Sequence, residues 1–177
     1  MNRADLAKEI YKTSHLTGEF KLRSGQISNE YFDKYLFEAK PQLLNEIAEA
    51  MKELIPIESM VLAGLETGGI PIATALSLKT GIETVFVRKK AKDYGTCKLA
   101  EGDEINGLKV CVIEDVVTTG GQIVASVKEL RQRGAIIDTV LCVIQRNPLA
   151  SELLAEEGLK LIPLFTMEYL KSQAGNI

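Results

Sequence analysis

The chain has no tryptophan, a single histidine and only three cysteines among its 177 residues. An odd number of cysteines without paired spacing argues against a disulfide framework and against a zinc site. The lone histidine, His15, offers no cluster for a metal or a Ser/His/Asp arrangement, and we interpret it as a helix-end residue without chemistry. No apolar run approaches the roughly 20 residues of a membrane span, and the polar start "MNRADLAKEIYKTS" is unlike a signal peptide. These absences predict a cytoplasmic protein with no membrane partner.

The chain also lacks a strong excess of either charge, since 21 Lys and Arg residues stand against 24 Asp and Glu residues. The net charge of −3 argues against a dedicated nucleic-acid-binding protein. The nucleotide-binding fingerprints G-x-x-x-x-G-K-[ST] and G-x-G-x-x-G are absent as well. With 46% hydrophobic residues and no linker or low-complexity segment, the sequence predicts one globular domain over residues 1–177.

From residue 59 onward, short apolar segments alternate with helical patterns. The segments "MVLAG", "TVFV", "KVCVI", "IIDTVLCVI" and "KLIPLF" predict five buried strands. Helical patterns lie between them, except that a long polar loop, residues 88–107, separates the second strand from the third. This alternation is typical of an α/β fold with a five-stranded parallel sheet flanked by helices. Such sheets bind their ligands beyond the carboxyl ends of the strands.

The first forty residues lie outside this alternation and predict a small hood on the α/β core of residues 41–177. Residues 3–13 have the apolar spacing of an amphipathic helix. The aromatic-rich segment "FKLRSGQISNEYFDKYLF" favours short strands and a hairpin over a helix. Pro41 then stands at the favoured first position of another helix.

The segment "VCVIEDVVTTGGQ", residues 110–122, joins an apolar strand ending in two carboxylates to a turn of small residues. The turn leads into a helix, whose free N–H groups and positive dipole end suit a phosphate dianion. Glu114 and Asp115 would repel that phosphate, so they should meet vicinal hydroxyls, a magnesium ion or a developing cation. A ribose 5-phosphate suits both parts of the segment, because its hydroxyls can meet the carboxylates and its phosphate can meet the turn. Because neighbouring strand residues point to opposite faces, we expect the two acids to do different jobs unless the backbone bends. The plain alternative is a charged strand end and an ordinary turn.

Four other stretches suit the same kind of ligand, and each has a plain alternative. The glycines of "AGLETGGIP" allow the backbone to approach an anion closely, or they form a simple strand-to-helix turn. The basic run that opens "RKKAKDYG" can close over a polyphosphate, or it is a solvated face. Tyr31 and Phe32 offer flat faces for a ring, or they pack within a hairpin. Arg146 follows the fourth strand, where its guanidinium can bind a carboxylate or simply face solvent.

Together these stretches resemble those of the type I phosphoribosyltransferases. "VCVIEDVVTTGGQ" is similar to the family's phosphoribosyl-pyrophosphate (PRPP) motif. "FKLRSGQISNEYFD", "GLETGGIPIATALS", "RKKAKDYGTCKLAEG" and "IQRNP" resemble, in the same order, segments of the orotate branch. The PRPP motif alone indicates the superfamily, whereas the N-terminal signature together with the basic loop indicates the orotate branch.

The resemblance implies that PRPP and orotate give orotidine 5′-monophosphate and pyrophosphate, with Mg²⁺ held mainly through PRPP. It also implies a homodimer in which the basic loop crosses into the partner subunit's site. Catalytic roles are implied for Lys92, Glu114 and Asp115. The implied substrate-binding residues are Arg23, Tyr31, Phe32, Glu66, Thr67, Gly68, Gly69, Arg88, Lys89, Lys92, Tyr94, Glu114, Asp115, Val116, Val117, Thr118, Thr119, Gly120, Gly121, Gln122 and Arg146.

Two alternatives stay open at this point. The first is a related enzyme that joins PRPP to a purine base, against which the N-terminal signature argues. The second is a non-catalytic regulator that senses PRPP on the same fold. Such a regulator would usually carry a DNA-binding segment, and the sequence shows no basic helical extension. The intact basic loop also favours the enzyme.

Overall fold

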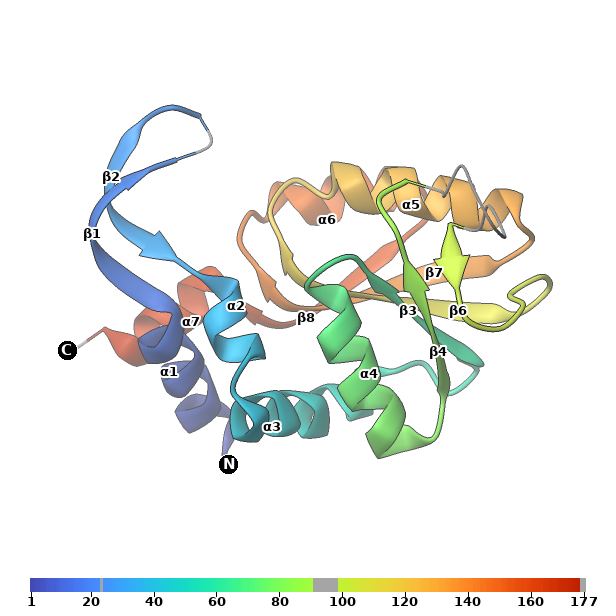
Figure 1. Ribbon diagram of the computed structural model, residues 1–177, viewed down its shortest axis with the longest axis horizontal. Helices are drawn as coiled ribbons and strands as arrows, with labels where there is room; N and C mark the ends of the chain where they lie inside the picture. Colours follow the sequence, from blue (N-terminus) through green and yellow to red (C-terminus); the bar gives the residue numbers. More distant parts are fainter. Residues whose placement is uncertain (23, 91–98, 176–177) are drawn as a thin grey trace.

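A computed structural model describes residues 1–22, 24–90 and 99–175, and its centre is a sheet between two layers of helices (Figure 1). The strand order is β5-β4-β3-β6-β7-β8. The strands are β3 (Val61–Leu65), β4 (Glu83–Val87), β5 (Ala100–Glu101), β6 (Lys109–Val117), β7 (Ile136–Gln145) and β8 (Lys160–Thr166). The five predicted strands are confirmed and run parallel. The short β5 pairs antiparallel with β4, so it adds an edge strand in a segment that the sequence placed in a loop.

Helices cover both faces of this sheet, which explains why its strands are apolar along most of their length. On one face lie α5 (Gly121–Gln132) and α6 (Leu149–Glu156). On the other lie α1 (Arg3–Ser14), α3 (Pro41–Met51), α4 (Gly69–Thr80) and α7 (Met167–Ala174). Among the described residues, no helix has the length and apolar character needed to cross a membrane.

The chain leaves the neighbouring strands β3 and β6 in opposite directions along the sheet. After β3 it passes through α4 to β4 on one side, and after β6 it passes through α5 to β7 on the other. Because α4 and α5 lie on opposite faces, the loops beyond the carboxyl ends of β3 and β6 separate. Such a switch point is where an open α/β sheet binds its ligand.

The N-terminal segment forms α1, a hairpin and a short helix. The predicted hairpin is confirmed as the antiparallel pair β1 (His15–Lys21) and β2 (Ile27–Phe32), which projects from the body of the molecule (Figure 1). The strand prediction was wrong beyond Phe32, because residues Lys34–Glu38 form helix α2, capped by the Asp33 carboxylate. In space α1 packs on α7 from the other end of the chain. The division into a hood of residues 1–40 and a core of 41–177 therefore stays a prediction.

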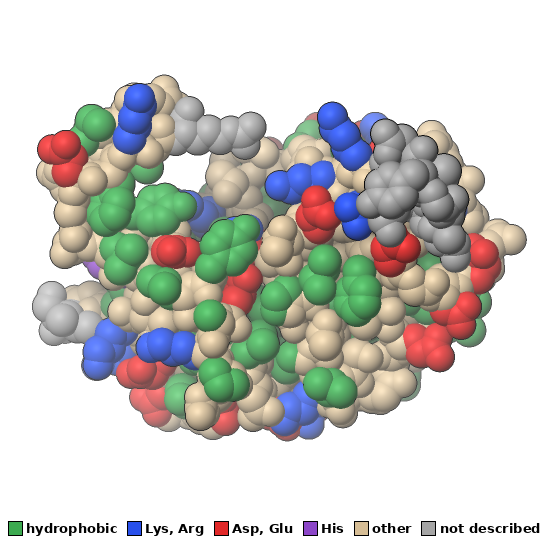
Figure 2. Space-filling model, in the orientation of Figure 1, with side chains coloured by type: hydrophobic (Ala, Val, Ile, Leu, Met, Phe, Trp, Pro, Cys, Tyr) green, Lys and Arg blue, Asp and Glu red, His purple; other side chains and the backbone are tan. Residues whose placement is uncertain are grey.

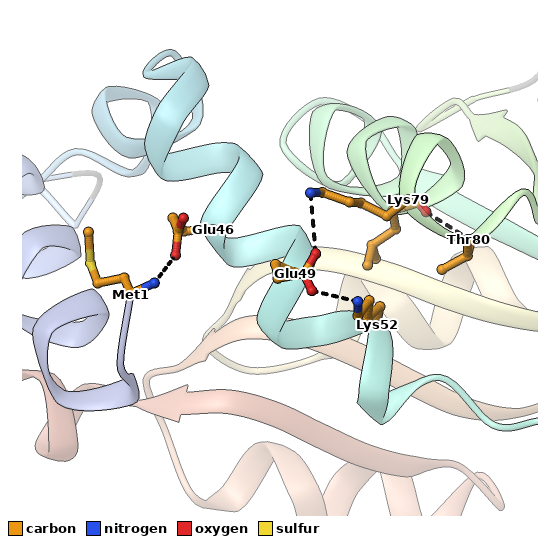
Figure 3. A network of polar contacts seen from close by, with 7 residues as sticks. Met1, Glu46, Glu49, Lys52, Lys79 and Thr80 are labelled. Atoms are coloured by element: carbon orange, nitrogen blue, oxygen red, sulfur yellow. Dashed lines mark hydrogen bonds and ion pairs between the residues drawn. The ribbon is translucent and has the colours of Figure 1, made fainter.

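Ion pairs join the helices that cover this second face (Figure 3). The amino group of Met1 lies 2.5 Å from a carboxylate oxygen of Glu46 on α3. Glu49 on α3 lies 2.5 Å from the ammonium of Lys52, at the start of the 3₁₀ helix Lys52–Leu54, and 3.2 Å from that of Lys79 on α4. Such partly exposed pairs contribute about 0–1 kcal/mol each. The buried apolar residues between the helices therefore supply most of the stability.

Candidate active site

A cavity of about 300 Å³ lies beyond the carboxyl ends of β3 and β6, at the switch point. It brings together most of the residues expected to hold PRPP: Glu66, Thr67, Lys89, Glu114, Val116, Val117, Thr118, Thr119, Gly120 and Gln122. Lys34, Tyr35 and Ile123, which the sequence did not single out, complete its lining. We call this the phosphate cavity.

Two helices begin at the phosphate cavity. Helix α4 starts at Gly69, after the loop of residues 66–68, and α5 starts at Gly121, after Thr118–Gly120. Neither helix has a side-chain hydrogen bond at its N-cap. Their first backbone N–H groups and the positive ends of their dipoles are therefore left for an anion. Gly120 has a φ of +83°, a left-handed conformation that favours glycine and directs the chain into α5.

The glycines before α4 allow the 66–69 loop to lie directly against β6. A Cβ atom at Gly68 would be 1.6 Å from Oδ2 of Asp115, and one at Gly69 would be 2.3 Å from the carbonyl oxygen of Ile113. Neither position can carry a side chain unless β6 or the loop moves. The Asp115 carboxylate thus lies against the backbone of the loop, so the loop and the acidic pair form one site.

Glu114 and Asp115 occupy different positions, as the alternation of a strand requires. Glu114 lines the phosphate cavity, whereas Asp115 is completely buried behind it. Asp115 Oδ2 lies 2.5 Å from the ammonium of Lys34 on α2. Glu38, also on α2 and only 7% exposed, faces the same carboxylate. The roles of the two acids stay predictions, but the buried cluster around Asp115 was not foreseen.

Three carboxyl groups surround Lys34, and their pKa values are shifted in different directions: Glu38, Glu114 and Asp115. Burial raises the pKa of Glu38 to about 9, and the hydrogen bond and charge of Asp115 add to the shift. Burial, followed by the same two effects of Asp115, raises the pKa of Glu114 well above its usual value. Burial opposes ionisation of Asp115 too, but hydrogen bonds from Glu114, Glu38 and Lys34 outweigh it and lower its pKa. Asp115 is therefore the carboxylate that stays ionised, paired with Lys34.

A second cavity, of about 160 Å³, lies between the hairpin, Arg146 and α7, and we call it the base cavity. Its lining includes Tyr31, Phe32 and Arg146, which the sequence predicted as base-binding residues. Tyr31 is 44% exposed and stacks on Phe20, with ring centroids 5.5 Å apart, so it is not a core residue of the hairpin. Lys171 of α7 adds a second positive charge that the sequence did not indicate.

His15 also lines the base cavity. It caps the C-terminal end of α1, as the sequence predicted, and its ring stacks on Tyr11 with centroids 4.8 Å apart. Its Nε2 lies 2.8 Å from a carboxylate oxygen of Glu30. These contacts fix the Glu30 side chain at the wall of the cavity, across the hairpin from α1.

The two cavities are adjacent, because the backbone N–H of Arg146 donates to the carbonyl of Val117 over 2.8 Å. Gln145, the residue before Arg146, is only 8% exposed. Its side-chain amide donates to the carbonyls of Asn147 and Pro148 and to the Ser151 hydroxyl. Gln145 thereby holds the turn that presents Arg146 at the end of β7.

The structure describes only part of the predicted basic loop of residues 88–107. The backbone N–H of Arg88 donates to the carbonyl of Leu99 over 2.9 Å, and Lys89 lines the phosphate cavity. Arg23, Lys92 and Tyr94 lie outside the described residues. Figure 2 shows the hollow between the hairpin and the body, with lysine and arginine side chains on both of its sides. Among residues 1–22, 24–90 and 99–175, no three or more His, Cys, Asp or Glu residues are arranged to hold a metal ion.

Comparisons with known proteins agree with this geometry. Residues 37–160 match the model of the phosphoribosyl transferase domain. An orotate phosphoribosyltransferase from a Nocardioides species is 52% identical over 163 residues, which cover 92% of this chain and 91% of the relative. A crystal structure of the Mycobacterium tuberculosis orotate phosphoribosyltransferase in complex with Fe(III) dicitrate superimposes with a TM-score of 0.86 at 32% identity, over 95% and 98% of the two chains. A structure of that enzyme in complex with PRPP gives a TM-score of 0.80 at 29% identity, over the same shares of the two chains.

Proposed function

The chain belongs to the orotate phosphoribosyltransferases, within the phosphoribosyl transferase domain family, and on that premise we propose how its two cavities divide the reaction. The enzyme transfers the 5-phosphoribosyl group of PRPP to orotate and releases pyrophosphate, a step of pyrimidine biosynthesis. In our proposal PRPP occupies the phosphate cavity and orotate occupies the base cavity. The observation that carries this assignment is that two uncapped helix N-termini meet at one cavity, with Glu114 in its wall and Asp115 directly behind it.

The phosphate cavity offers separate partners for the two ends of PRPP. The N–H groups at the start of α5, together with the hydroxyls of Thr118 and Thr119, suit the 5-phosphate. The 66–69 loop and the start of α4 suit the pyrophosphate, with Lys89 adding positive charge at the wall. Glu114 then lies at the cavity wall between these two anion sites, where the ribose would be, and Asp115 lies buried directly behind it. The negative charge of Asp115, the carboxylate that stays ionised, favours the cationic sugar that forms as pyrophosphate leaves C1.

The base cavity suits a flat anionic ring. Tyr31 and Phe32 offer aromatic faces, and Arg146 offers a guanidinium fork to the carboxylate of orotate. Because orotate is already anionic, it needs little activation as a nucleophile. Holding the ring and the sugar in adjacent cavities converts a bimolecular reaction into an effectively unimolecular one. Catalysis in this proposal consists of positioning and electrostatics, with no covalent enzyme intermediate.

We also propose that Mg²⁺ is required. The carboxylates of Glu66 and Glu114 line the phosphate cavity, and hard oxygen donors of this kind fit Mg²⁺ when the substrate's phosphates supply further oxygens. Mg²⁺ bound with PRPP would supply positive charge beside the departing pyrophosphate. The ion would be held mainly through the phosphates of PRPP, with the carboxyl oxygens of Glu66 and Glu114 at the cavity wall beside it, while Asp115, buried behind the wall, stays paired with Lys34.

A spectrophotometric assay of orotate consumption tests this proposal. We expect turnover only when PRPP and Mg²⁺ are both present. Adenine and hypoxanthine serve as controls, because their conversion without that of orotate would favour the purine-base alternative. PRPP binding without turnover of any base would favour the non-catalytic regulator.

We propose a homodimer in which the basic loop serves the partner subunit's site, as the resemblance implies. A Lys92→Ala chain and an Asp115→Asn chain would then be defective in different halves of a shared site. Each mixed dimer should contain one site with both changes and one with neither. Refolding the two inactive variants together should restore part of the activity. If mixed dimers form and no activity returns, the loop acts in its own subunit.

A cytoplasmic location is the last part of this proposal. Cys111 and Cys142 are buried and free of disulfides within the described part of the chain. Burial raises the pKa of the Cys111 thiol to about 12, so this group stays protonated and inert at neutral pH. Cys97 lies outside the described residues. Buried, unreactive thiols of this kind are compatible with a reducing compartment.

A further inference from the structure

A cation from a distant part of the chain lies beside the 66–69 loop. Lys34 lies on the short helix α2, after the hairpin, and its ammonium is 2.5 Å from Asp115 Oδ2. A side chain at Gly68 would begin 1.6 Å from that same oxygen atom. Lys34 therefore places a positive charge beside a segment of the loop that has no room for a side chain of its own.

The ammonium of Lys34 is shared between a buried partner and the phosphate cavity. Its side chain is 33% exposed and lines the cavity, whereas Asp115 is 0% exposed. An ammonium group has three N–H donors, and the ion pair with Asp115 uses one side of it. The remaining donors are left for a group inside the cavity.

The charges of the cavity wall indicate what that group is. Glu66 and Glu114 line the phosphate cavity next to the 66–69 loop, and Asp115 lies behind them. A diphosphate placed on this loop would face three carboxyl groups, which would repel it unless they are protonated or neutralised. The described cations that line the cavity are Lys34 and Lys89. Of these, Lys34 is the one in contact with the acid that lies against the loop.

We propose that Lys34 is a substrate-binding residue whose ammonium links Asp115 to the diphosphate group of PRPP. Lys34 supplies from α2 a positive charge beside Gly68, where the 66–69 loop has no room for a side chain of its own. The inference rests on the proposed function, because it takes the phosphate cavity as the PRPP site. It also gives helix α2 a part in substrate binding, in addition to the hairpin that precedes it.

Binding of inorganic pyrophosphate, measured by titration calorimetry with Mg²⁺ on the full chain, tests the proposal without the ribose. We expect Lys34→Met to weaken pyrophosphate binding roughly ten- to a hundredfold, the effect of losing one charge-assisted contact. Lys34→Arg, which keeps the charge, should recover part of the affinity. Lys128→Met is the matched control, since Lys128 forms a 2.7 Å ion pair with Glu157 and is not among the lining residues of the cavity.

Binding of ribose 5-phosphate, measured in the same way, distinguishes a direct contact of Lys34 with the diphosphate from an indirect effect through Asp115. If Lys34 acted only by holding Asp115, Lys34→Met would weaken binding of ribose 5-phosphate and leave pyrophosphate binding unchanged. That result overturns the proposal. If the wild-type chain does not bind pyrophosphate at all, the assignment of the cavity is overturned as well. If the wild-type chain binds pyrophosphate and Lys34→Met binds it equally well, only the role of Lys34 is overturned.

A labelling experiment on the wild-type chain covers the case in which Lys34→Met does not fold. Lysine side chains would be acetylated with and without pyrophosphate and Mg²⁺, and the modification of Lys34 and Lys128 would be compared by mass spectrometry. We expect pyrophosphate to slow modification of Lys34 several-fold and to leave Lys128 unchanged. Equal modification of Lys34 in both conditions would contradict a direct contact.

Discussion

The two cavities hold their charges in different ways. Behind the wall of the phosphate cavity, Asp115 is completely buried and is surrounded by Lys34, Glu38 and Glu114. In the base cavity, Arg146 and Tyr31 are exposed side chains on the surface of a smaller hollow. Charges in a low-dielectric environment interact strongly and respond to each other, whereas exposed charges are screened by water.

This difference has a structural origin. The phosphate cavity is formed mainly by β6, the start of α5 and the loop after β3, which belong to the packed α/β core, and α2 adds Lys34 and Tyr35. The base cavity is formed by the hairpin, the end of β7 and α7, which come from the two ends of the chain and from one strand end. We therefore expect substitutions in the first cavity to affect catalysis and pH dependence. Those in the second should mainly affect the affinity for one substrate.

The largest expected effect is that of Asp115→Asn. Because the change removes a buried charge next to the predicted ribose position, kcat should fall by about a hundred- to a thousandfold, as for other fixed groups that stabilise transition-state charge. The measurement is kcat at saturating orotate and PRPP, with a thermal melt to confirm folding. Asp138→Asn is the control, because Asp138 forms a 3.0 Å ion pair with Lys109 outside both cavities. Similar losses of kcat in both variants would show that Asp115 has no special role in catalysis.

A smaller and more selective effect is expected for Arg146→Ala in the base cavity. Loss of one charge-assisted contact to the orotate carboxylate should raise the KM for orotate roughly ten- to a hundredfold. The KM for PRPP and the melting temperature should change little, since Arg146 is exposed. Michaelis constants for both substrates test this, with the exposed Arg133→Ala as control. An equal rise for both substrates would show that the two cavities are not separate in function.

The smallest expected effect concerns Glu38 and the pH dependence of stability. The pKa of Glu38 is about 9 in the folded protein, above the ordinary value of 4.5. Between these pH values the folded state keeps a proton that the unfolded state has lost. The contribution of Glu38 to stability is therefore present below pH 4.5 and is lost as pH rises toward 9.

Replacing Glu38 by glutamine removes this titration and keeps the shape of the side chain. We expect Glu38→Gln to melt about 2–4 °C higher than the wild type at pH 8, the shift that 1 kcal/mol gives in a domain of this size. The difference should shrink toward pH 5. Glu156→Gln, on the exposed surface of α6, is the control. A difference that is the same at both pH values would show that Glu38 does not retain its proton.

Much of the fold could be predicted because its signals are local. The five parallel strands are buried on both faces, so each appears in the sequence as a short continuous apolar run. The helices between them end at glycines such as Gly81 and Gly134, both of which have positive φ. The turns before α4 and α5 carry the glycines that their geometry requires, since a Cβ at Gly68 or Gly69 would clash with β6 and Gly120 has a positive φ. Their place at the sheet edge follows from the parallel topology itself.

Other features depended on contacts between distant segments. Helix α2 has only five residues, too few for a helical pattern to be visible, and it lies in a segment rich in strand formers. The two-residue strand β5 exists only as a partner of β4. Lys171 reaches the base cavity because α7 packs on α1 from the opposite end of the chain.

The acidic pair shows most clearly what the local sequence determines and what only the tertiary structure decides. The sequence alone determined that Glu114 and Asp115 lie near the carboxyl end of a buried strand, in front of a turn of small residues, because the strand pattern and the glycines are both local. The prediction that the strand ends at these acids was wrong by two residues, since β6 continues to Val117. Only the tertiary structure decided that Asp115 lies between Lys34 and Glu38, residues about eighty positions earlier in the chain. The charge state of a buried carboxylate depends on which groups surround it in space, and no local pattern records those neighbours.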